Sequence, residues 1–128
     1  MSYHFSTVLS CSWDEARQKI ESALKDEGFG ILTEINVQAT LKAKLGVDFR
    51  PYVILGACNP VFAHKALQSE KYIGTMLPCN VIMQQNDRGE VEVSAVDPVA
   101  SMQAIENQQL ALVAAEVREK LIRVVANL

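Results

Sequence analysis

The sequence has little of what marks fibrous, low-complexity or membrane-spanning chains. Among its 128 residues only 6 are glycine and 4 are proline, which excludes a collagen-like or low-complexity protein. Its longest apolar run, over residues 52–58, is far shorter than the roughly 20 residues that cross a bilayer. The first residues mix polar and apolar side chains, so we expect neither a signal peptide nor a membrane partner. Since 49% of the residues are hydrophobic, we expect a single globular domain over residues 1–128.

An excess of basic residues is also missing, as are several well-known site motifs. The chain has 12 Lys and Arg against 15 Asp and Glu, so it lacks the positive charge that nucleic-acid binding requires. Its three cysteines show neither a C-x-x-C nor a zinc-finger spacing. There is no phosphate loop, dinucleotide fingerprint or Ser-His-Asp order. The sequence therefore predicts a protein of the reducing cytoplasm with no nucleic-acid partner, and it identifies no cofactor or reaction.

What the chain does have is a regular alternation of strand and helix patterns. An apolar period of two predicts strands over residues 3–9, 29–36, 51–58, 77–85 and 90–96. Helical spacing predicts long helices after Ser12, after Asn59 and from Gln108, and shorter helices after Asn36 and over residues 99–105. Ser12 with Glu15 forms a capping box, and Asn59 with Pro60 suits a helix start.

This order predicts a two-layer α+β domain. The sheet is expected to be curved and mainly antiparallel, with about five strands and with the helices packed on one face. Its first two strands are expected to be parallel neighbours joined by the first long helix. The remaining strands are expected to pair in antiparallel fashion, with residues 77–85 and 90–96 forming a hairpin.

Following the strand directions places five residues of chemical interest at one end of the sheet, and His64 lies on the second turn of the helix that starts there. Cys11 falls at the other end of the sheet, about 20 Å away if the strands have six or seven residues. The candidate site residues are Cys58, Asn59, Cys79, Asn80, His64 and Asp97.

Two interpretations of this cluster remain open. In the first, Cys58 precedes a helix N-terminus that would favour its thiolate, and Cys79 is a resolving thiol. His64 would then serve as a base or a third metal ligand, while Asn59 and Asn80 would donate hydrogen bonds to an anion. In the second, the cysteines are small buried hydrophobic residues, Asn59 is only a cap and His64 is exposed.

Five stretches, taken together and in this order, resemble a known family. They are GFGILTEI (28–35), LKAKLG (41–46), YVILGACNP (52–60), LPCNV (77–81) and SAVDP (94–98), and they are similar to the domain of unknown function 302. The resemblance implies a β-α-β(4)-α fold like half of the TATA-binding protein, and small prokaryotic proteins that often form homodimers. It implies no established activity, and the TATA-binding analogy concerns the fold alone.

Three functional hypotheses follow. The first is a domain that binds a small ligand or a metal, or a second copy of itself, near Cys58 and Cys79. The second is a thiol-redox protein that uses these two cysteines. The third is a structural homodimerisation module, whose interface would be the exposed side of strand 52–58 or the C-terminal helix. Whether the protein is an enzyme stays open at this point.

Overall fold

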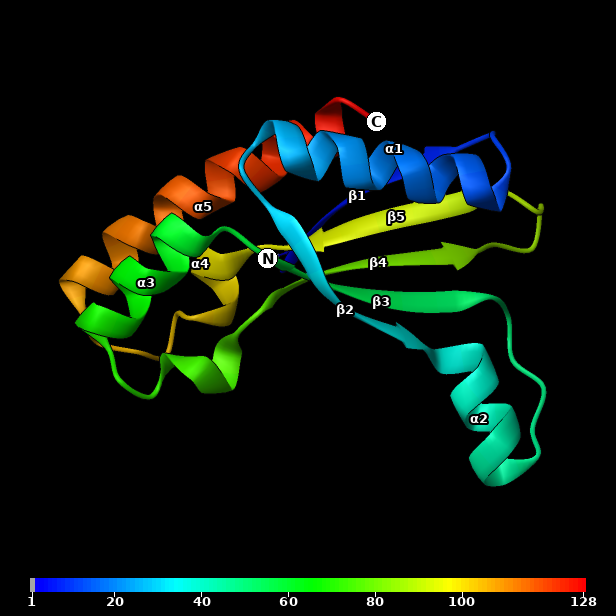
Figure 1. Ribbon diagram of the computed structural model, residues 1–128, viewed down its shortest axis with the longest axis horizontal. Coiled ribbons are helices and arrows are strands. Elements are labelled where there is room, and N and C mark those ends of the chain that lie inside the picture. Colours follow the sequence, from blue (N-terminus) through cyan, green and yellow to red (C-terminus); the bar gives the residue numbers. More distant parts are fainter. Residues whose placement is uncertain (1) are drawn as a thin grey trace.

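The computed structural model describes residues 2–128, and one five-stranded sheet organises them (Figure 1). The strand order is β1-β5-β4-β3-β2, and every neighbouring pair is antiparallel. The strands are β1 (His4–Leu9), β2 (Gly30–Asn36), β3 (Tyr52–Cys58), β4 (Cys79–Gln85) and β5 (Val91–Val96). The predicted two-layer α+β class is confirmed.

The two longest helices cover one face of this sheet, and three short ones gather at one end of it (Figure 1). Within residues 2–128, no helix has the length and apolar character needed to cross a membrane. The helices are α1 (Trp13–Asp26), α2 (Val37–Leu45), α3 (Pro60–Ser69), the 3-10 helix η1 (Ile73–Met76), α4 (Pro98–Ser101) and α5 (Gln108–Ala126). Of these, α3, η1 and α4 lie at the end of the sheet opposite α2.

The expectation that the first two strands are parallel neighbours was wrong. Strands β1 and β2 run in the same direction but lie at opposite edges of the sheet, with β5, β4 and β3 between them. The physical reason is burial. Residues of β3, β4 and β5 are buried or half-buried almost throughout, whereas most of β2 is exposed. Strands whose side chains are mostly buried belong in the centre, where each pairs with two neighbours, and more exposed strands tolerate an edge.

The hydrophobic core lies between the sheet and the helices α1 and α5. Strand alternation points Leu55, Val81 and Val93 toward the helices, and all three are fully buried. They belong to one cluster with Ile20 of α1 and Leu121 of α5. Burial of each such side chain contributes about 1.5–3 kcal/mol, so this layer fixes how the sheet and helices sit against each other.

Local signals in the sequence set the ends of several elements. The Ser12 hydroxyl oxygen accepts a hydrogen bond from the Glu15 backbone N–H at 3.2 Å, as the capping box predicts. Helix α1 is followed by Gly28, whose φ of +84° lies in the left-handed region that favours glycine. The turn at Gly28 leads the chain from α1 into β2.

Candidate functional site

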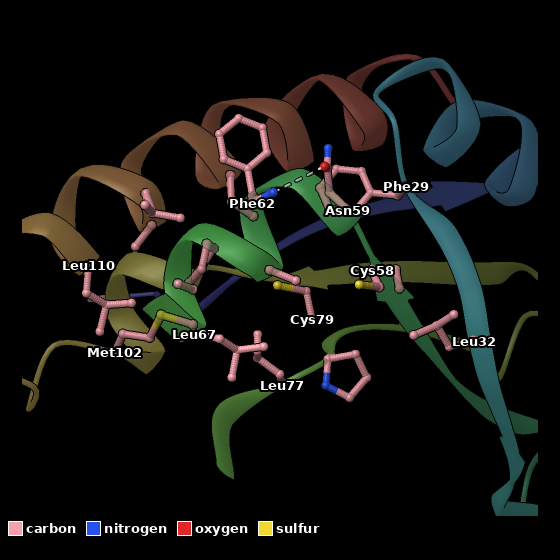
Figure 2. Close-up of a pocket in the computed structure, with 18 residues that line it drawn as sticks. Phe29, Leu32, Cys58, Asn59, Phe62, Leu67, Leu77, Cys79, Met102 and Leu110 are labelled. Carbon is pink, nitrogen blue, oxygen red and sulfur yellow. Dashed lines mark hydrogen bonds between the residues drawn. The ribbon is translucent and has the colours of Figure 1, made fainter. Parts of the chain in front are cut away.

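A cavity of about 300 Å³ lies at the end of the sheet where β3 ends and β4 begins. The ends of the strands form one wall, and α3, α4 and α5 form the other (Figure 2). It is partly open to solvent. The lining residues are Phe29, Leu32, Ala57, Cys58, Asn59, Phe62, Ala63, Ala66, Leu67, Leu77, Pro78, Cys79, Pro98, Met102, Leu110, Val113, Ala114 and Val117.

The wall of the cavity is almost entirely apolar. No charged side chain is among the described residues that line it, and the only strongly polar one is Asn59. The Asn59 amide is already engaged, because its Oδ1 accepts from the Phe62 backbone N–H at 3.5 Å and its Nδ2 donates to the Glu27 carbonyl at 3.2 Å (Figure 2). Asn59 therefore caps α3 and ties it to the end of α1, as the structural interpretation of this residue predicts.

Cys58 and Cys79 both line this cavity. They come from adjacent strands, where the Cα partner of Cys79 is Ala57, so Cys58 is one residue further along β3. Both are free thiols, Cys79 buried and Cys58 half-buried. Burial, with a smaller contribution from the nearby Cys58, raises the pKa of Cys79 from its ordinary value of 9.0 to about 11. Cys79 is therefore a protonated thiol at neutral pH.

The other candidate residues lie elsewhere. His64 is exposed on α3 and does not line the cavity. Asn80 is exposed on the opposite face of the sheet, because it neighbours the buried Cys79 along a strand. Cys11, between β1 and α1, packs against the main core instead.

Asp97 is buried, and its hydrogen bonds give it a structural role. Its Oδ1 accepts from the backbone N–H groups of Val99 and Ala100, which caps α4, and its Oδ2 accepts from Arg118 Nε at 3.2 Å. Pro98, the next residue, lines the cavity. Asp97 thus helps to hold the neighbouring Pro98, and with it this part of the cavity wall, in place.

No set of three His, Cys, Asp or Glu side chains between residues 2 and 128 is grouped closely enough to hold a metal ion. In particular, His64 does not complete a three-ligand set with the two cysteines. The site brings together Cys58, Asn59 and Cys79, and surrounds them with apolar side chains.

Sequence reasoning missed this apolar wall. The spacing of residues on α3 and α5 predicts buried stripes, and residues of these stripes line the cavity as well as contribute to the core. A signal was present on α3, where Ala63 and Ala66 place small side chains on the inward face. Small residues at positions that face a sheet leave space that larger ones would fill.

Comparisons with known proteins agree with this architecture. The family model described as "Domain of unknown function DUF302" matches residues 5–128. A crystal structure of an uncharacterized conserved DUF302 protein from Bacillus stearothermophilus is 29% identical with a TM-score of 0.91, over 99% of this chain and 98% of that chain. No curated protein matches the sequence. The chain therefore belongs to the DUF302 family.

Proposed function

We propose that this protein binds a small, predominantly apolar molecule in the cavity between the strand ends and the helices α3, α4 and α5. The observation that carries the proposal is a partly open space of about 300 Å³ with an almost wholly apolar wall. Ligand sites in proteins have volumes of about 300–1,000 Å³ and mainly apolar linings. This cavity is at the lower end of that range.

The volume of the cavity and the exposed residues at its rim limit which ligands can bind. An apolar cavity of about 150 Å³ accommodates benzene, so twice that volume suits about twelve non-hydrogen atoms. Two leucines of the lining, Leu32 and Leu67, are 67% and 46% exposed. A ligand that covers them removes apolar surface from water, and this contributes to its affinity. Because Asn59 is already paired, a charged group on the ligand would find no partner in the wall.

Ligand binding is better supported than thiol-redox chemistry. In the redox hypothesis Cys79 is the resolving thiol, which must also attack as its thiolate, and the raised pKa of Cys79 keeps it protonated at neutral pH. Homodimer formation stays a prediction, and the C-terminal helix that it invoked carries Leu112 exposed on its surface.

Naphthalene, an uncharged molecule of ten non-hydrogen atoms, tests the proposal. We expect it to shift the amide resonances of α3, of α5 and of the strand ends around Cys58 and Cys79 in ¹H–¹⁵N NMR spectra. Ala63→Phe fills part of the cavity and should weaken naphthalene binding at least about tenfold, which corresponds to 1.4 kcal/mol.

Ala115→Phe is the matched control, because Ala115 is exposed on α5 and does not line the cavity. It should bind naphthalene as the unsubstituted protein does. Resonances that do not move up to the solubility limit of naphthalene, or equal losses in the two variants, would contradict the proposal.

A further inference from the structure

The two thiols are the only side chains of the cavity wall that form covalent bonds to a ligand under mild conditions, and the Met102 thioether is the only other soft coordinating group there. Every other lining residue is a hydrocarbon, the thioether Met102 or the paired amide of Asn59. A ligand that reacts with thiols would therefore bind here through Cys58 and Cys79.

Cys58 and Cys79 come from neighbouring positions at the ends of β3 and β4. Cys79 lies opposite Ala57 in the β3–β4 pair, and Cys58 follows Ala57 directly. Paired Cα atoms lie roughly 5 Å apart and consecutive ones 3.8 Å, so the Cα atoms of Cys58 and Cys79 lie roughly 6 Å apart. Regular alternation would send the two side chains to opposite faces. The β3–β4 pairing ends at Ala57, however, Cys58 pairs only with Gly30 beside an irregularity in β2, and both cysteines line the same cavity. Figure 2 shows their sulfur atoms in the same part of the wall.

The net charge of the complex between the two thiols and a ligand decides which metal or metalloid atom can bind here. Lys65 and Lys120 approach the Phe62 ring at 5.2 and 5.7 Å, but neither lines the cavity. A copper(I) ion bound by two thiolates carries a charge of minus one, and burying an unpaired charge in an apolar wall is costly. Zinc sites use three or four protein ligands, and residues 2–128 place no His, Asp, Glu or further Cys beside these cysteines as a third one. A complex that carries no net charge and needs only two protein ligands avoids both the buried charge and the missing third ligand.

We propose that Cys58 and Cys79 together bind a trivalent arsenic centre that carries one apolar substituent, with the substituent lying in the cavity. This inference rests on the proposed function, since it names the class of ligand for the same cavity. The hydrated arsenical has one As–C bond and two As–OH groups. Two As–S bonds form and two As–O bonds break, and the two thiol protons leave with the hydroxides as two molecules of water. Arsenic stays trivalent, nothing is oxidised or reduced, and the product is neutral.

Phenylarsine oxide is the probe, because its phenyl group is apolar and the bound phenylarsenic unit fits the cavity volume. The folded protein is incubated with it in excess 2-mercaptoethanol, desalted and measured by native mass spectrometry. The monothiol removes arsenic from single cysteines. We expect one phenylarsenic unit to remain on the unsubstituted protein and on Cys11→Ala. Cys58→Ala and Cys79→Ala should each bind it at least about tenfold more weakly.

Naphthalene titrations of the same variants separate this inference from the proposed function. If Cys58→Ala and Cys79→Ala bind naphthalene and no longer retain phenylarsenic, the dithiol site is supported. If the unsubstituted protein binds naphthalene and does not retain phenylarsenic, only this inference is overturned. Absence of naphthalene binding in the unsubstituted protein overturns the proposed function.

Two further outcomes would also overturn the dithiol site. One is retention of phenylarsenic by both cysteine variants. The other is retention of copper(I) in competition with phenylarsine oxide, because it would contradict the charge argument. If Cys79→Ala does not fold, as judged by its NMR spectrum, Cys79→Ser replaces it and the same criteria apply.

Discussion

The two faces of the sheet each have a hollow of similar size but of opposite chemistry. The cavity under the helices has a volume of about 300 Å³ and an apolar wall. The bare face has a hollow of about 380 Å³, whose wall mixes polar and apolar side chains. By volume alone, the hollow on the bare face would be the better ligand site. The two hollows differ instead in which of their side chains still lack a binding partner.

In the hollow on the bare face, several polar groups already form hydrogen bonds with neighbouring side chains. Ser6 and Ser94 share a hydrogen bond of 2.6 Å between their hydroxyls, and His4 Nδ1 lies 2.7 Å from the Ser6 hydroxyl. Gln84 accepts from Arg50 Nε at 2.9 Å and donates to Glu92 at 3.4 Å. Cross-strand pairs of this kind stabilise a sheet. The apolar cavity differs because its exposed leucines can be covered only by something that enters it.

The largest effect that separates the two faces should come from the buried thiol of Cys79. Its pKa is about 11 in the folded protein against 9.0 ordinarily, so the unfolded chain loses this proton first as the pH rises. We expect the free energy of unfolding to fall by up to about 3 kcal/mol between pH 9 and 11. Below pH 9 the thiol is protonated in both states, so the free energy of unfolding keeps its full value there.

Denaturant titrations under reducing conditions measure this fall. Other groups also titrate in that range, so the quantity of interest is the difference between the unsubstituted protein and Cys79→Ala. Cys11→Ala should keep the full pH dependence. Parallel curves for the unsubstituted protein and Cys79→Ala would show that the cavity does not shield this thiol from water.

Gly56 lies on β3, opposite Asn80 of β4. A Cβ atom there would lie 2.7 Å from Cγ of Pro78 in the cavity wall and would overlap the Thr33 hydroxyl. We expect Gly56→Ala to lower the free energy of unfolding by about 2 kcal/mol, since overpacking forces neighbouring atoms to shift.

Gly30→Ala is the matched control for this change, because a Cβ atom at Gly30 meets nothing within 4 Å. Chemical denaturation of both variants measures the contrast. Gly56→Ala in a Thr33→Ala background should recover part of the loss. Equal stabilities of the two single variants would show that strands β2 and β3 can separate at this point without cost.

The smallest expected effect belongs to the bare face. Ser94→Ala removes the hydrogen bond to Ser6 and should cost about 1 kcal/mol, the usual net value of one such bond. Because Ser94 does not line the apolar cavity, naphthalene affinity should stay unchanged. NMR titration of this variant measures it, and a weaker affinity would mean that the two faces are coupled through the sheet.

Much of the site could be predicted from strand directions alone. The ends of β3 and β4 meet at the same end of the sheet, and this placed Cys58 and Cys79 near each other and apart from Cys11. The same alternation puts Cys79 and Asn80 on opposite faces, so Asn80 could have been separated from the cluster without a structure. The role of Asp97 was less accessible, because its partner Arg118 is 21 residues away on α5.

The sequence by itself determined the order of the elements, the direction of each strand and several helix ends. These depend on residues within a few positions of one another, as with the hydrogen bonds between Ser12 and Glu15 or Asn59 and Phe62. Only the tertiary structure decided that β1 and β2 occupy opposite edges, and that a space remains between the strand ends and the helices α3, α4 and α5. Strand order and cavity volume depend on how segments far apart in the chain share one core, and a local pattern does not contain that information.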